Sequence, residues 1–191
     1  MARAVVAVDV GLRNMSWCVC AGPEGLEPQE LAARLRLISW TTEALPLPAG
    51  AGPADALRAV VEHVAGKEEL LCAADAVVIE QQPAARMREV AACLFGLARR
   101  AARPEALVLL QPSRRKLELV VQDAPELCGD RSSWAARKRA AVALTRHLLA
   151  ERPEWLSVLA SAKKKDDMAD SFLHAVAYLA KQRKATKRPR A

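Results

Sequence analysis

The chain has 191 residues, of which 52% are hydrophobic and only 4% are aromatic, and its formal net charge is +7. This length fits one domain with a substantial core. The sequence contains no run of about 18 apolar residues, so we expect no membrane-spanning helix. The N-terminus shows no secretory signal, and the five cysteines are scattered and odd in number, so we expect an intracellular protein in a reducing compartment.

Positive charge is concentrated in the second half of the chain. Residues 1–98 contain 8 Lys/Arg and 12 Asp/Glu, whereas residues 99–191 contain 21 Lys/Arg and 10 Asp/Glu. A basic half favours a polyanionic partner, with nucleic acid as the first candidate, and solvated surface charge as the alternative. We expect a single domain at 1–180, followed by a basic C-terminal tail at 181–191.

Apolar periodicity and turn residues predict the order of the elements. Short apolar runs indicate strands, and apolar residues at helical spacing indicate helices. We predict strands at 3–10, 15–20, 35–42, 73–80 and 107–110, the last of them buried, and helices at 54–65, 84–102 and 134–150. Between them we predict a loop at 21–33, a Pro/Gly/Ala linker at 46–53 and a polar loop at 122–133. Pro153 is predicted to interrupt regular structure before a final helix that carries the Lys/Asp motif.

Two of the predicted strands end in a carboxylate. Asp9 closes the first apolar run, just before Gly11, and Glu80 closes the fourth. A carboxylate at the end of an apolar strand is costly unless it is paired, hydrogen-bonded or bound to metal. Chemistry in open sheets collects at the carboxyl ends of parallel strands, so Asp9 and Glu80 lie side by side if their strands are parallel neighbours.

Three further acids lie at the start of the last predicted helix. Asp166, Asp167 and Asp170 follow three lysines, and at spacings of three and four residues they share one helix face and repel one another. A hard divalent cation such as Mg²⁺ would remove this conflict. The alternative is a plain helix N-terminus, where acids interact favourably with the macrodipole.

Basic residues gather at two predicted helix starts. Arg114, Arg115 and Lys116 follow the strand at 107–110, and Lys138 lies near the beginning of the helix at 134–150. Cations at a helix start gain nothing from the helix dipole, so phosphate contact is one explanation and solvent exposure is the other.

Four motifs in this order resemble the RuvC-like Holliday junction resolvases, especially their poxvirus-type branch. They are "VDVGLRNMSW", "VVIEQQP", "QPSRRK" and "KKKDDMADSFLHA", and together they span essentially the whole chain. The resemblance implies an α/β protein with the ribonuclease H-like fold, a mixed central sheet with helices on both faces. The long Pro/Ala-rich loop at 43–53 and the basic tail depart from the family pattern.

The resemblance also implies roles for individual residues. The four metal-binding carboxylates would be Asp9, Glu80, Asp167 and Asp170, with Asp166 as a further candidate ligand, and Lys116 would be the basic residue near the cut. The DNA-binding candidates are Arg114, Arg115, Lys138, Lys164 and Lys165. His174 lies one turn beyond Asp170, near the expected site, and we assign it a structural role.

The activity implied by the resemblance is endonuclease cleavage of four-way DNA junctions. A homodimer would make two symmetric nicks, each with two Mg²⁺ ions bridged by Asp9, for which Mn²⁺ can substitute, and each leaving a 5′ phosphate. A poxvirus-type protein would work in the host cytoplasm.

Three other functions remain open at this point. A related nuclease would act on other branched DNA or on RNA–DNA hybrid. A junction-binding protein without catalysis would have no need of four acids. An ATPase of the actin or sugar-kinase type would also open with Asp-x-Gly on a strand, but it needs a second lobe and a second glycine-rich phosphate loop.

Overall fold

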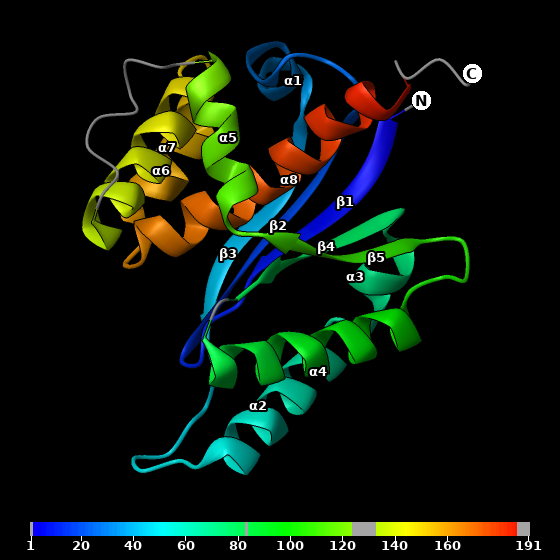
Figure 1. Ribbon diagram of the computed structural model, residues 1–191, viewed down its shortest axis with the longest axis vertical. Coiled ribbons are helices and arrows are strands. Elements are labelled where there is room, and N and C mark those ends of the chain that lie inside the picture. The colour runs from blue at the N-terminus through cyan, green and yellow to red at the C-terminus, as the bar shows by residue number, and fades with distance from the viewer. Residues whose placement is uncertain (1, 83, 124–132, 187–191) are drawn as a thin grey trace.

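A five-stranded mixed sheet forms the centre of the computed structural model, which describes residues 2–82, 84–123 and 133–186 (Figure 1). The strands are β1 (Ala2–Asp9), β2 (Asn14–Pro23), β3 (Arg36–Ala44), β4 (Ala76–Gln81) and β5 (Leu107–Pro112), in the order β3-β2-β1-β4-β5. The pairs β1–β2 and β2–β3 are antiparallel, whereas β1–β4 and β4–β5 are parallel. The two acid-bearing strands, β1 and β4, are thus parallel neighbours, which is the condition under which Asp9 and Glu80 were expected to lie side by side.

Helices cover both faces of this sheet. They are α1 (Pro28–Arg34), α2 (Pro53–Ala65), α3 (Glu68–Ala73), α4 (Ala85–Ala101), α5 (Arg114–Asp123), α6 (Trp134–Leu148), α7 (Pro153–Ser161) and α8 (Lys165–Thr186). Figure 1 shows α8 crossing one face with α1, α5, α6 and α7 around it, and α2, α3 and α4 on the other face. The predicted α/β architecture with helices on both faces is confirmed.

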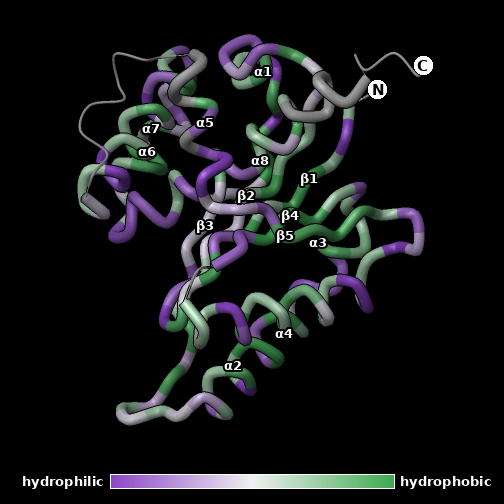
Figure 2. Tube along the Cα trace, viewed as in Figure 1, coloured by the Kyte–Doolittle hydropathy of each residue, from purple (hydrophilic) through white to green (hydrophobic). Residues whose placement is uncertain are grey.

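Strand β1 is buried on both sides because its alternate residues enter two different cores. Val5 and Ala7 pack in the core that contains α8, whereas Val6 and Val8 pack in the core beneath α2 and α4. In Figure 2 much of β1 and β4 accordingly has the colour of hydrophobic residues. Side chains alternate between the faces of a strand, so a continuous apolar run indicates burial on both faces.

Helix α8 is fixed to the sheet by a tryptophan from β3. The Trp40 indole Nε1 donates hydrogen bonds to the Met168 carbonyl at 2.9 Å and to Ser171 Oγ at 3.3 Å. The Trp40 ring also contacts Phe172, with centroids 5.5 Å apart, and Phe172 is fully buried. These contacts set the position of α8 along the sheet, and with it the direction in which its acids point.

Three local predictions were wrong. The expected loop at 21–33 contains α1, whose Leu31 and Ala32 are buried in the α8 core. The strand at 107–110 is an edge strand, with Leu107 45% and Leu110 39% exposed, because no further strand pairs with β5 in the described sheet. Beyond Pro153 the chain forms α7 before the last helix begins. Short helices carry too few residues for a clear periodic signal.

The predicted domain boundary remains a prediction. Helix α8 continues past residue 180 to Thr186, and residues 187–191 of the expected tail lie outside the described residues, as do residues 124–132 of the expected polar loop. Among the described residues, no helix combines the length and apolar character needed to cross a bilayer.

Replacing Trp40 with Phe should weaken the attachment of α8 while keeping an aromatic ring beside Phe172. The variant loses the two hydrogen bonds that Nε1 donates to α8. We expect the free energy of unfolding to fall by about 0.5–1.5 kcal/mol, because the hydrogen bonds from Nε1 are lost while the Met168 carbonyl still accepts one from Ser171 Oγ. Urea unfolding followed by circular dichroism measures this loss.

Trp155→Phe in α7 is the matched control, since the described structure contains no hydrogen bond from the half-buried Trp155 indole. Equal losses in the two variants would contradict the role of Trp40 as an anchor of α8.

Candidate active site

Two carboxylates meet at the carboxyl ends of the parallel strands β1 and β4. Val8 pairs with Ile79 in this register, so Asp9 and Glu80 follow on neighbouring strands. Gly11 makes the turn after Asp9 very tight, because a Cβ atom there would lie 2.2 Å from the Asn14 carbonyl oxygen. The first two carboxylates of the site therefore lie at the carboxyl ends of two buried strands.

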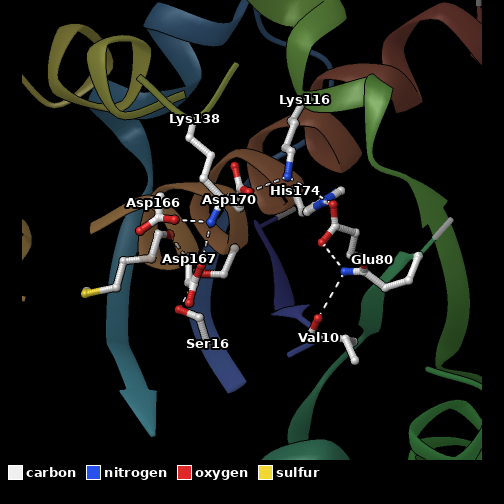
Figure 3. Close-up of polar contacts among 12 residues, drawn as sticks. Val10, Ser16, Glu80, Lys116, Lys138, Asp166, Asp167, Asp170 and His174 are labelled. Atoms are coloured by element: carbon white, nitrogen blue, oxygen red, sulfur yellow. Dashed lines mark hydrogen bonds and ion pairs between the residues drawn. The ribbon is translucent and has the colours of Figure 1, made fainter. Parts of the chain in front are cut away.

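Helix α8 adds a third carboxylate to this pair. Asp170 points from α8 toward the strand ends (Figure 3), and one oxygen from each of Asp9, Glu80 and Asp170 lies within 4.8 Å of the others. All three residues are at most 9% exposed. Residues from three distant parts of the sequence thus form one buried acidic cluster.

Lys116 from α5 reaches into the same cluster. Its ammonium Nζ lies 3.0 Å from Glu80 Oε1 and 2.6 Å from Asp170 Oδ2, and the residue is 7% exposed. Burial alone would lower the pKa of this lysine, but Asp170 and Glu80 outweigh burial and raise its pKa above the ordinary value. Lys116 therefore stays positively charged between two acids.

The three acids differ in their affinity for a proton. Burial, together with the neighbouring Glu80 and Asp170, raises the pKa of Asp9 well above its usual range. Burial also raises the pKa of Asp170, despite the adjacent ammonium. Burial acts in the same direction on Glu80, but hydrogen bonds from Asp9 and His174 and the charge of Lys116 hold its pKa well below the ordinary value. A raised pKa on Asp9 beside a lowered pKa on Glu80 is the pattern of two close carboxyl groups whose titrations are coupled.

This arrangement fits a divalent metal. Asp170 Oδ1 is buried and has no hydrogen-bond partner among the described residues, although a buried carboxylate oxygen normally has one. A single ammonium also leaves three carboxylates undercompensated. Carboxylate oxygens are the ligands that Mg²⁺ and Mn²⁺ prefer, so Asp9, Glu80 and Asp170 are suited to hold such an ion.

Asp167 and Asp166 lie beside this cluster and share a lysine. Lys138 Nζ is 3.2 Å from Asp167 Oδ1 and also forms an ion pair with Asp166. Despite burial, these pairs raise the pKa of Lys138 and lower that of Asp166. Asp167 lines the cleft over the acidic cluster, whereas Asp166 is not part of that lining.

Side chains at two places orient Glu80, and two of the three, Gln82 and Gln111, were not assigned in the sequence analysis. Gln82 Nε2 donates to Glu80 Oε2 at 2.6 Å and to the Val10 carbonyl at 3.0 Å, so it joins the ends of β4 and β1. Its position two residues after Glu80, just past the end of β4, is the signal that could have identified it, because side chains at this spacing along an extended chain point to the same side.

The second place is occupied by Gln111 and His174. Gln111 Nε2 lies 2.8 Å from His174 Nδ1 and 3.2 Å from the His174 carbonyl, so Nδ1 accepts and Nε2 faces Glu80 Oε1 at 3.5 Å. His174 is fully buried, and its contacts orient a neighbouring acid.

An open cleft of about 510 Å³ lies over the acids. The residues that line it include the cluster, Lys116 and a basic rim made of Arg114, Arg137 and Lys138. Of the five predicted DNA-binding residues, Arg114 and Lys138 line this cleft. The other three are outside its lining: Arg115 is paired with Glu118 at 3.0 Å, Lys164 is exposed, and Lys165 donates to the Ala162 carbonyl at 2.8 Å.

Comparison with known proteins gives structural relatives only. No protein-family model and no curated protein sequence matches the chain. The yeast mitochondrial Holliday junction resolvase Ydc2 superposes with a TM-score of 0.68 at 16% identity, over 96% of this chain and 82% of that one. RuvC of Thermus thermophilus gives a TM-score of 0.60 at 17% identity, over 96% and 97% of the two chains. The fowlpox virus Holliday junction resolvase gives 0.59 at 15% identity, over 93% and 99%.

The chain has the ribonuclease H-like fold of these resolvases. The predicted fold is confirmed over at least 93% of this chain and over at least 82% of each relative. At such low sequence identity the likeness concerns the fold, and the roles of individual residues rest on the geometry of this cleft.

Replacing Lys116 with Met should destabilise the metal-free protein strongly. The variant keeps most of the side-chain volume but leaves Glu80 and Asp170 without their ammonium partner. Breaking a buried ion pair in this way costs about 3–5 kcal/mol of unfolding free energy. We expect this loss in EDTA and a smaller difference from the wild type in Mg²⁺, because a bound cation would replace the missing charge. Urea unfolding under both conditions measures it.

Lys67→Met removes a lysine from the half-exposed pair with Glu43, at 2.8 Å, and serves as the control. Its expected loss is below about 1 kcal/mol in either condition. A gap between wild type and Lys116→Met that is the same with and without Mg²⁺ would contradict a metal site at this cluster.

Proposed function

We propose that this protein is a structure-selective endonuclease that resolves four-way (Holliday) DNA junctions by paired nicks. The observation that carries the proposal is the convergence of Asp9, Glu80 and Asp170 within 4.8 Å under a cleft with a basic rim. The same fold serves Holliday junction resolvases, and the Thermus thermophilus and fowlpox virus proteins have both been solved with Holliday junction DNA. The basic second half of this chain suits such a polyanionic partner.

The acidic cluster is proposed to hold two Mg²⁺ ions, for which Mn²⁺ can substitute. Asp9, Glu80 and Asp170 would be ligands, and Asp167 would add a fourth carboxylate when Lys138 releases it. Bound ions of this kind lower the pKa of a coordinated water and stabilise negative charge on phosphate oxygens.

The other residues of the cleft would position the DNA strand and compensate its charge. Lys116 keeps its positive charge beside the acids, so it can offset the charge that develops on the scissile phosphate. Arg114 and Lys138 on the cleft rim would bind neighbouring phosphates. Gln82 and His174 would keep Glu80 in its orientation.

Two symmetric nicks require two active sites, so we propose that the protein acts as a homodimer. A two-fold dimer would place its sites on two strands of a junction that has the same symmetry. The solved relatives come from a yeast mitochondrion, a bacterium and a poxvirus, so the shared fold does not favour one source. A viral origin and action in host cytoplasm stay predictions based on the sequence motifs.

Loss of any one acid of the cluster should abolish cutting and preserve DNA binding. Asp9→Asn, Glu80→Gln and Asp170→Asn keep the side-chain size but remove a negative ligand. We expect nicking to fall at least about hundredfold, since even the groups that support metal ligands contribute ten- to hundredfold. The measurement is nicking of a labelled four-way junction in Mg²⁺, mapped on both strands, with binding measured in EDTA.

Asp75→Asn, which changes a half-exposed acid paired with Arg103 away from the cleft, is the control and should cut normally. Wild-type cutting by any one of the three cluster variants would refute the site. Parallel assays with a flap and an RNA–DNA hybrid distinguish a junction resolvase from a related nuclease. ATP hydrolysis without DNA would instead indicate the ATPase.

The neighbouring acids Asp166 and Asp167 offer a matched pair of variants. Both contact Lys138, but only Asp167 lines the cleft. We expect Asp167→Asn to lower the nicking rate at least about tenfold, as for a weakened metal site. Asp166→Asn should change it less than about fivefold, as for the loss of a surface ion pair. Equal effects would mean that both acids act only through Lys138.

A further inference from the structure

Trp134 is the exposed aromatic residue of this protein. All seven aromatic residues lie in the described part of the chain, and the other six are buried or half-buried, whereas Trp134 is 65% exposed. Tryptophan stabilises a fold by burying its large apolar ring, and an exposed ring gives little of this stabilisation. Folding therefore does not explain why a tryptophan stands at this position.

The position of Trp134 relates it to the cleft. It is the first residue of α6, directly after the N-cap Ser133, and its side chain lines the same cleft as Asp9, Glu80 and Asp170. Lys138, one turn along the helix, places its Nζ 4.4 Å from the centroid of the indole ring. The ring is thus held beside the basic rim, with much of its surface open to solvent.

An open indole among cations is suited to single nucleobases. Aromatic side chains stack on bases with little regard to sequence, while neighbouring lysines and arginines hold the phosphates. In a continuous duplex, base pairs above and below cover both faces of each base. A base at a branch point has lost one of these neighbours and can offer a face to a protein ring.

We infer that Trp134 stacks on a nucleobase that is unstacked at the branch point of the DNA, and that this contact selects branched DNA over continuous duplex. The inference rests on the proposed nuclease function, because it uses the cleft as the place where DNA is cut. It assigns Trp134 a role in choosing the substrate that neither the acids nor the phosphate-binding cations can supply, since phosphates are common to all DNA.

A supporting role for Lys138 is the competing explanation. The indole would then only hold the Lys138 ammonium through a cation–π contact. In that case its loss would weaken binding to duplex and to junction by the same factor, and it would leave the bases themselves unaffected.

The experiment compares wild type, Trp134→Ala and Trp134→Phe, with Ile38→Ala as a control at an exposed apolar residue outside the cleft. Four-way junctions carry the fluorescent base 2-aminopurine at one branch-point position at a time, and EDTA prevents cutting during the fluorescence titrations. Affinity for a duplex of equal length and junction nicking rates in Mg²⁺ are measured in parallel.

Stacking predicts that wild type and Trp134→Phe quench 2-aminopurine at a branch-point position, and that Trp134→Ala does not. Alanine substitution of a base-stacking aromatic weakens binding about five- to a hundredfold, so Trp134→Ala should lose this factor on the junction and keep its duplex affinity. Phenylalanine should restore most of the loss, and Ile38→Ala should behave as the wild type.

The other outcomes would contradict either the stacking role of Trp134 or the proposed nuclease function. If Trp134→Ala quenches 2-aminopurine and cuts as the wild type does, Trp134 does not stack, while the nuclease proposal stands. If junction and duplex binding fall equally, Trp134 acts through Lys138 and the inference fails. If the wild type neither binds nor cuts four-way junctions, the proposed function fails and this inference falls with it.

Discussion

Mutual repulsion among three buried carboxylates is the constraint on which the arrangement around this cleft depends. Asp9, Glu80 and Asp170 lie within 4.8 Å of one another, largely out of water. Such crowding is unfavourable unless cations, protons or donors compensate it. The beginning of α5 brings Lys116 to this point, and the crowding raises the pKa of Asp9 well above its usual range. The position of α5 thus serves the charge balance of the cluster as well as the apolar packing.

In the folded protein without metal, two lysines supply positive charge beside the acids. Lys116 contacts Glu80 and Asp170, and Lys138 contacts Asp166 and Asp167. The protein can thus fold before any ion arrives, because its own side chains supply part of the missing positive charge. Divalent cations would then compete with ammonium groups already in position, so the affinity of the site depends on how readily these lysines find phosphates instead.

The sequence was sufficient for the features that depend on local pattern. Apolar runs ending in Asp9 and Glu80 predicted two strands that each end in an acid, and the spacing of Asp167 and Asp170 predicted that they share one face of a helix. It was not sufficient where distant packing decides. Asp167 lines the cleft and Asp166 does not, although both acids pair with Lys138 of α6. The exposure of β5 and of Trp134 likewise depends on which segments lie opposite them, and a local pattern does not contain that information.

The contribution of α8 to both the core and the acidic cluster has a consequence for biosynthesis. The ribosome delivers β1 and β4 well before α8, and until α8 arrives one face of the sheet lacks the helix that covers it. Domains generally fold as units as they emerge, so the sheet and the cluster gain their final form together. A nascent or partly degraded chain without α8 lacks Asp170, and therefore no copy of this protein that lacks α8 holds the full set of acids.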